Sequence, residues 1–556
     1  MKKSKIALRL ITGLVALLVL CQSLTGCATL ISLLSFSAIP SLNVQLETIP
    51  SYEVNYTDED HEALVKAKGD LDSLLEDPDS HSYASLISGL ESFLTQTYWL
   101  FEQMQLARLQ NTIYPNDKEI EQTYMDLYGE AIEYQSLIYQ YYVKIYNSKH
   151  REQFFSDWPE ETIKMVLSKG ASDDPQLTEL EQENEEIIVT VQNLDRTSPK
   201  FKDGVYSNYR KYVLNAQKIA ELNGYDNYYK YMSELNFYRD YSLETMKSFI
   251  DAVAMYVPEV FIHFYDAYIN FSGGGYLTDN DRDILKKLDQ SFLESGTNRL
   301  AEDFFKWEHP EILDYFYKTS EYDNIFVGTE EDGSLQQAFT FVMNYSGIPV
   351  MYFGPGYDDL STFIHEFGHA FNMANTRESN SLASLDLDEV ASQAHELMFI
   401  YYLSSRLSQE AYQYYLAASL SYHLRTILLS ALVADFEYEV YVNGRTDFDG
   451  IIDDLLDGPF AKATEFLGKE TLAGYIQLVC CQSPCYYISY ATSLMPCLEL
   501  FKLAVENGDD AARSTYYKLV TNSDKNFIDI TEDCGLPNPV APKTIADLCQ
   551  FLKSNY

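Results

Sequence analysis

The chain has 556 residues, of which 46% are hydrophobic and 22% are charged, so it is long enough to bury an extensive apolar core. Its formal net charge of −43 argues against proteins that bind nucleic acid or anionic lipid electrostatically. We interpret the acidic surface as a solvated face, with attraction of cationic peptides as the alternative. Nothing in the composition indicates an oligomeric state.

The N-terminal segment is expected to direct the chain out of the cytoplasm. A basic start is followed by the apolar stretch 10–20, which is too short for an ordinary spanning helix. Residues 24–27 then read Leu-Thr-Gly-Cys, which resembles a bacterial lipobox. This pattern predicts a signal peptide at 1–26, a lipid on Cys27 and a membrane lipoprotein that faces outside the cytoplasm. An uncleaved anchor helix is the alternative, because residues 28–42 are still apolar.

The body of the chain is predicted to be all-α, with helices from residue 57 onward. Apolar residues recur at helical spacing over Ser85–Leu109, Glu119–Ile145 and Tyr206–Leu222. We divide the chain into a tether at 27–56, an N-terminal helical domain at 57–236 and a second domain at 237–556.

The second domain is predicted to begin with a long apolar helix over Leu243–Phe271. Two strands are predicted at Ala338–Met343 and Ile348–Phe353, on either side of a turn. An edge strand at this place could pair with an extended peptide.

Cysteine usage leaves two interpretations. Cys21 would leave with the signal peptide, and the six cysteines that remain beside Cys27 all lie in the last 77 residues. An even number in an exported chain permits disulfides, and we expect one or two. The alternative is that these cysteines are buried thiols in packed helices. The six are Cys480, Cys481, Cys485, Cys497, Cys534 and Cys549.

The candidate catalytic and metal-binding residues begin with the motif His-Glu-Phe-Gly-His at 365–369. On a helix, this spacing places His365 and His369 on one face, one turn apart. Two neutral imidazoles so placed can hold one Zn²⁺, and Glu366 can take a proton from a water on the metal. The alternative is a core helix whose histidines have other partners.

A zinc hydrolase needs a third protein ligand, and the downstream stretch offers several carboxylates. Glu389 lies 20 residues after His369, and Glu396 follows two helical turns later on the same face. One of the two can bind the metal while the other accepts a hydrogen bond from a ligand histidine. Glu378, His395 and Glu396 are rival ligands, and sequence order leaves the choice open.

Four stretches together resemble the M3 family of zinc metallopeptidases, the oligoendopeptidase F and thimet oligopeptidase group. They are His-Glu-Phe-Gly-His-Ala from 365, Glu-Val-Ala-Ser from 389, the lead-in at 357–363, and 484–492 with Pro, spaced tyrosines and Ala-Thr. The resemblance is specific over 345–495. It implies two helical lobes around a deep channel, with a catalytic domain at 237–556.

The resemblance also implies roles for individual residues. His365, His369 and Glu389 would bind one zinc ion, and Glu366 would be the general base. Glu396 would support a ligand from outside the coordination sphere. Tyr486 and Tyr490 would face the substrate and stabilise the oxyanion. The implied activity is hydrolysis of internal bonds in short, unfolded oligopeptides.

The chain departs from the family pattern in two places. The loop between His369 and Glu389 is a few residues shorter than usual, and the histidine that family members carry before the tyrosines is absent. That position falls near Val479, and no histidine follows His423. Two alternatives therefore stay open: a non-catalytic or weakly active peptide-binding lipoprotein, and a metallocarboxypeptidase on the same fold.

Overall fold

The computed structural model describes residues 52–156, 158, 160–170, 175–271, 277–376, 384–468, 472–481, 483–522 and 525–556. The predicted signal peptide, Cys27, most of the tether and the rival ligand Glu378 lie outside these residues. Helices make up 74% of the structure and a small sheet has three strands, which confirms the predicted fold class.

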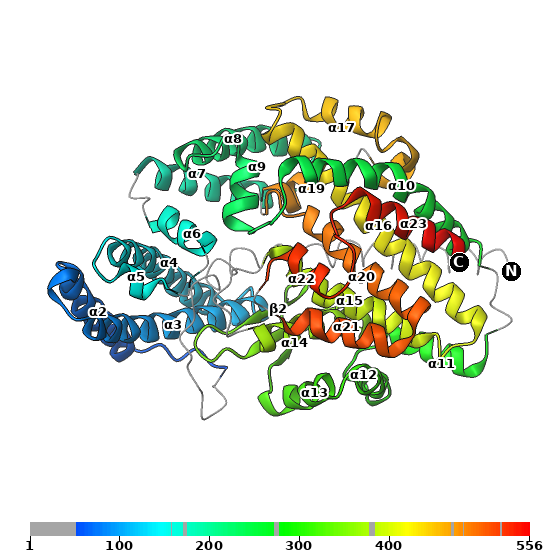
Figure 1. Ribbon diagram of the computed structural model, residues 1–556, viewed down its shortest axis with the longest axis horizontal. Helices are drawn as coiled ribbons and strands as arrows, with labels where there is room; N and C mark the ends of the chain where they lie inside the picture. Colours follow the sequence, from blue (N-terminus) through cyan, green and yellow to red (C-terminus); the bar gives the residue numbers. More distant parts are fainter. Residues whose placement is uncertain are drawn as a thin grey trace.

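Helices α2 to α6 lie on one side of the molecule, at the blue and cyan end of the chain (Figure 1). The N-termini of α2, α3 and α4 are stabilised by side-chain caps: Thr57 and Asp60 form a capping box, and Ser82 and Asp117 accept backbone N–H groups. A separate apolar cluster holds these helices together. They are α2 Asp58–Leu75, α3 Tyr83–Ile113, α4 Lys118–Tyr146, α5 Arg151–Phe154 and α6 Glu160–Gly170.

The remaining helices share one large apolar core. That core continues across position 236, since it takes in residues of both α8 and α10. The division into domains at 236 stays a prediction. The helices before the sheet are α7 Pro175–Gln192, α8 Phe201–Leu222, α9 Tyr228–Tyr231, α10 Leu243–Ile269, α11 Asp279–Leu288, α12 Ser295–Glu308 and α13 Pro310–Tyr322.

Ten helices follow the sheet in the described part of the chain, and three of them, α14, α15 and α20, lie near the centre of the molecule (Figure 1). They are α14 Leu360–Thr376, α15 Leu385–Leu403, α16 Gln409–Tyr441, α17 Phe448–Asp457, α18 Thr464–Leu467, α19 Leu472–Tyr475, α20 Ile488–Asn507, α21 Asp509–Thr521, α22 Phe527–Asp533 and α23 Pro542–Asn555. By length and composition α16 and α20 could cross a membrane, but 78% and 83% of their apolar windows are buried. They are therefore typical of core helices.

The sheet has the order β1–β3–β2, with β1 (Ile325–Val327) parallel and β2 (Ala338–Val342) antiparallel to β3 (Pro349–Phe353). Strands β2 and β3 agree closely with the predicted strands. Side chains alternate between two faces. Phe339 and Phe341 pack with residues of α3, whereas α14 lies against the sheet and Thr340 points to it.

Helix α3 also holds the turn between β2 and β3. Glu102 Oε2 accepts the backbone N–H groups of Tyr345 and Ser346, and Gln105 Oε1 accepts that of Asn344. The amide of Gln105 donates to the Val342 carbonyl at 3.0 Å. The N-terminal helices therefore fix the position of the edge strand β2.

The expectation of one or two disulfides is wrong. All six cysteines of the described part are free thiols, and five of them are buried. Their clustering in the last 77 residues reflects burial in packed helices, the alternative considered above.

Candidate metal centre

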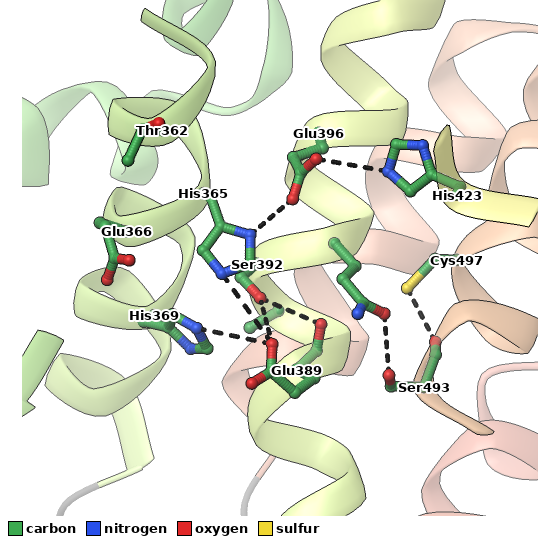
Figure 2. Close-up of polar contacts among 12 residues, drawn as sticks. Thr362, His365, Glu366, His369, Glu389, Ser392, Glu396, His423, Ser493 and Cys497 are labelled. Carbon is green, nitrogen blue, oxygen red and sulfur yellow. Dashed lines mark hydrogen bonds and ion pairs between the residues drawn. The ribbon is translucent and has the colours of Figure 1, made fainter. Parts of the chain in front are cut away.

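The site lies between α14 and α15, which pack closely side by side (Figure 2). Three phenylalanines recur every fourth residue on the opposite side of α14, and all are at most 2% exposed. Phe363 stacks on Phe292, and Phe367 stacks on Phe305. This face anchors α14 in the core, so the histidine face is directed toward α15.

Gly368 makes the close approach of the two helices possible. A Cβ atom at this position would lie 2.8 Å from the Ala391 carbonyl oxygen and 2.9 Å from Ser392 Cα. Both are atoms of the α15 backbone, so a larger residue would push the helices apart. The glycine of the motif thus sets the spacing on which the site depends.

Three candidate ligands converge across this interface. His365, His369 and Glu389 each offer a donor atom, and these atoms lie within 4.8 Å of one another. The two histidine Nε2 atoms are 3.9 and 3.8 Å from Glu389 Oε2, too far for hydrogen bonds. Zinc bonds of 2.0–2.1 Å in a tetrahedron require donor separations of about 3.3 Å, so these residues fit a zinc ion after a small adjustment.

Each candidate ligand is oriented by a partner outside the donor set. Glu396 Oε1 lies 2.5 Å from His365 Nδ1, and His369 hydrogen-bonds to the backbone of Asp388. Both rings therefore direct Nε2 toward Glu389 (Figure 2). Glu396 thus contacts His365 from outside the donor set, and its supporting role stays a prediction.

The rival ligand His395 lies elsewhere. It is fully buried, pairs with Glu308 and stacks against Tyr516. Its position on α15 turns it away from the donor set, so it belongs to the packing of the core.

Glu366 has the surroundings expected of a general base. Its side chain is 3% exposed, and Thr340 Oγ1 of β2 donates to Oε2 at 2.7 Å. Burial raises the pKa of Glu366 to about 7, which is close to the value that suits proton transfer at neutral pH.

The two histidines titrate differently. Burial lowers the pKa of His369 to about 4. Burial also acts to lower the pKa of His365, but its hydrogen bond to Glu396 outweighs this and raises the value to about 9. A metal ion bound here has to displace the proton of His365, so binding weakens as the pH falls.

The predicted tyrosines lie next to this centre. Tyr486 is 2% exposed, and its hydroxyl donates to Glu389 Oε1 at 2.9 Å. Tyr490 contacts its ring edge to face, with centroids 5.3 Å apart. In this structure Tyr486 thus supports the carboxylate of a candidate ligand, and the oxyanion role of both residues stays a prediction.

A buried arginine holds the segment that carries Tyr486. Arg239 donates to the carbonyl of Cys485 at 2.9 Å and to Ser489 Oγ at 2.8 Å. Glu437 accepts the Cys485 N–H at 2.9 Å, and the backbone of Cys485 is left-handed, with φ of 64°. This cluster fixes a strained turn immediately before Tyr486.

Sequence reasoning did not identify Arg239, Thr340 or His423, which approaches Glu396 from α16. Each is a single residue that belongs to none of the motifs. For Thr340 alone the sequence gave an indication, because it lies in the strand predicted next to the histidine helix. Val479, at the place of the absent family histidine, is 2% exposed and belongs to the π-helical turn Ile476–Cys480.

Two histidines one helical turn apart, a carboxylate from the next helix and a buried glutamate define a metallohydrolase centre of the His-Glu-x-x-His type. Residues 314–519, which include the site, match the model of peptidase family M3. The match confirms the resemblance seen in the motifs, and it supports a metallopeptidase. No curated protein matches the chain.

Solved structures agree in fold. A putative oligoendopeptidase F has a TM-score of 0.70 at 15% identity over 91% of this chain and 97% of its own. A putative oligoendopeptidase F from Bacillus anthracis has a TM-score of 0.64 at 15% identity, over 93% and 98%. A carboxypeptidase from Pyrococcus furiosus has a TM-score of 0.50 at 12% identity, over 91% and 100%. At these identities the similarity concerns the fold alone.

Proposed function

We propose that the protein is a zinc-dependent endopeptidase that hydrolyses internal bonds of short, unfolded oligopeptides. The observation that carries this proposal is the convergence of His365, His369 and Glu389 beside the buried carboxylate of Glu366. His365, His369 and Glu389 would hold the ion. A zinc ion so held supplies Lewis-acid chemistry, because it polarises the peptide carbonyl and acidifies water.

The remaining steps fall to residues of the chain. Glu366 accepts a proton from the attacking water and delivers it to the leaving amine, while Thr340 holds its Oε2 atom in place. The edge strand β2, which carries Thr340, offers backbone groups to an extended peptide. Tyr486 and Tyr490 are the proposed phenol donors to the oxyanion, and Tyr486 would turn its hydroxyl away from Glu389 to act in this way.

The first experiment compares the full chain with Glu366→Gln. We expect one equivalent of zinc in both proteins, and a loss of kcat of about 10²–10⁴-fold in the variant, the usual contribution of a general base. Gln keeps the shape of the side chain but cannot accept the proton. Zinc without cleavage in the wild type would favour a peptide-binding protein instead, and no zinc would refute the proposal.

The same assay separates internal from terminal cleavage. Short peptides with an acetylated N-terminus and an amidated C-terminus carry no terminal charge, so an endopeptidase cleaves them as it does the free peptides. A metallocarboxypeptidase, the second candidate, releases single C-terminal residues and requires the free carboxylate. The similarity in fold to a carboxypeptidase is the reason to include this control.

We also propose that the enzyme is an exported lipoprotein attached to a bacterial membrane through Cys27. This proposal is supported by the lipobox-like Leu-Thr-Gly-Cys at 24–27 after a basic and apolar leader. Metabolic labelling with palmitate should mark the wild-type chain and not Cys27→Ala. Labelling of both, or of neither, would contradict lipidation at this cysteine.

A further inference from the structure

A third histidine approaches the metal centre from a helix that carries none of the motifs. His423 lies on α16 and is 4% exposed. Its Nε2 atom is 3.3 Å from Glu396 Oε2 (Figure 2). Its Nδ1 atom is 2.7 Å from the carbonyl oxygen of Ser419. On its other oxygen, Glu396 contacts His365. One carboxylate therefore lies between two imidazoles from two different helices.

The hydrogen atoms of this arrangement can be assigned by counting donors and acceptors. The Ser419 carbonyl only accepts, so Nδ1 of His423 carries a hydrogen. The other ring nitrogen, Nε2, faces Glu396 Oε2 in a close polar contact of 3.3 Å. On the other side of the carboxylate, Nδ1 of His365 contacts Glu396 Oε1, so the nitrogen of that ring that faces Glu389 is Nε2.

The contact with His423 restrains a carboxylate that would otherwise be mobile. The side chain of Glu396 is 20% exposed, so one oxygen bound only to water would let the group rotate. With both oxygens engaged, the carboxylate plane is fixed between α14 and α16. The ring plane of His365 is fixed in turn, because its Nδ1 has to follow Oε1 of Glu396.

We infer that His423 is a positioning residue of the metal centre, which acts on His365 through Glu396. This inference rests on the proposed function, in which His365 is a zinc ligand. His423 does not reach the donor atoms, so its effect is on the orientation of a ligand. Its loss should lower zinc affinity even where the fold is intact.

Two near-isosteric replacements separate the two contacts of His423. In His423→Gln, the terminal amide nitrogen takes the place of Nε2 and keeps a polar contact with Glu396 within reach. In His423→Asn, the amide nitrogen takes the place of Nδ1 and reaches only Ser419. Both variants are polar and uncharged, so they differ chiefly in whether the side chain reaches Glu396 or Ser419. His150→Gln is the matched control, because His150 is likewise buried, at 6% exposed, and bonds to the His81 carbonyl in the N-terminal helices.

The experiment measures the zinc dissociation constant of the full chain by competition with a chelator, and the thermal unfolding of the metal-free proteins. Removal of a partner outside the coordination sphere typically weakens metal binding about 10–100-fold. We expect about a 10-fold loss for His423→Asn, the lower end of that range, because this partner is one step further from the metal. His423→Gln and His150→Gln should bind zinc as the wild type does.

The outcomes are distinct. Wild-type affinity in His423→Asn, or equal losses in the Asn and Gln variants, would overturn the role of the Glu396 contact while leaving the proposed function intact. Absence of zinc from the wild type would overturn both. The unfolding temperatures of the metal-free proteins show whether a loss of affinity in one variant merely follows a loss of folded protein.

Discussion

Substitution of Gly368 by alanine tests whether the spacing of α14 and α15 controls the site. The added Cβ would lie 2.8 Å from a carbonyl oxygen of α15, whereas ordinary contacts begin at 3.4 Å. Because the neighbour is backbone, no side-chain rotation relieves the clash. The helices must separate by about 0.6 Å, the difference between those two distances. Overpacking of this kind costs about 1–3 kcal/mol.

The same displacement affects metal binding. Zinc–ligand distances tolerate errors of about 0.2 Å, and Gly368→Ala moves His365 and His369 away from Glu389 by more than that. We therefore expect Gly368→Ala to unfold at a lower denaturant concentration and to bind zinc more weakly. Urea unfolding followed by circular dichroism, with zinc titration of the same samples, measures both effects.

Gly129→Ala is a control for which we expect the opposite change in stability. It lies inside α4, and a Cβ there would meet no atom within 4 Å. Alanine in a helix interior is favoured over glycine by about 0.5–1 kcal/mol, so Gly129→Ala should stabilise the protein. The reasoning would be refuted if Gly368→Ala were as stable as Gly129→Ala and bound zinc like the wild type.

Three further substitutions have defined expectations. Tyr486→Phe removes the donor to Glu389 and should weaken zinc binding about 10–100-fold in chelator competition; an unchanged affinity would contradict that support. Thr340→Val removes a hydrogen bond that stabilises the Glu366 carboxylate, so the acid limb of kcat/KM should move to higher pH, and movement to lower pH would count against it. Burial raises the pKa of Glu437 from 4.5 to about 8, so the folded chain retains a proton that the unfolded chain loses, and stability falls as pH rises between these values. Glu437→Gln should reduce the fall in stability between about pH 5 and about pH 8, measured by urea unfolding, and a fall equal to that of the wild type would refute the assignment.

Local patterns predicted the helices and the strands nearest the site. The periodic residues of Glu119–Ile145 became α4 Lys118–Tyr146, and Ile348–Phe353 became β3 Pro349–Phe353. Such elements are visible because apolar spacing reports directly which face is buried. Strand β1 has three residues, too few to show a period, and it was not predicted.

The sequence alone identified only part of the candidate ligand set. Helical spacing alone paired His365 with His369, because both lie on one helix. Glu389 was selected through the resemblance, since periodicity within α15 does not say which helix α15 packs against. His423 lies on a third helix, and its contact with Glu396 depends on how α16 crosses α15. The prediction of disulfides was wrong for a related reason. The number of cysteines and the cellular compartment say nothing about the distances between cysteine pairs in the fold, and those distances decide whether a disulfide can form.

The hydrogen bonds from α3 to the turn after β2 limit how far the protein can be shortened from its N-terminus. Truncation before α7 would leave the N–H groups of Asn344, Tyr345 and Ser346 without the acceptors that Glu102 and Gln105 supply. The same cut would expose the apolar face of β2 that packs on α3. The strand beside Glu366 is thus held in place by residues from two distant parts of the chain, and a fragment made from the motif-bearing half would lack the helix that packs on one face of β2.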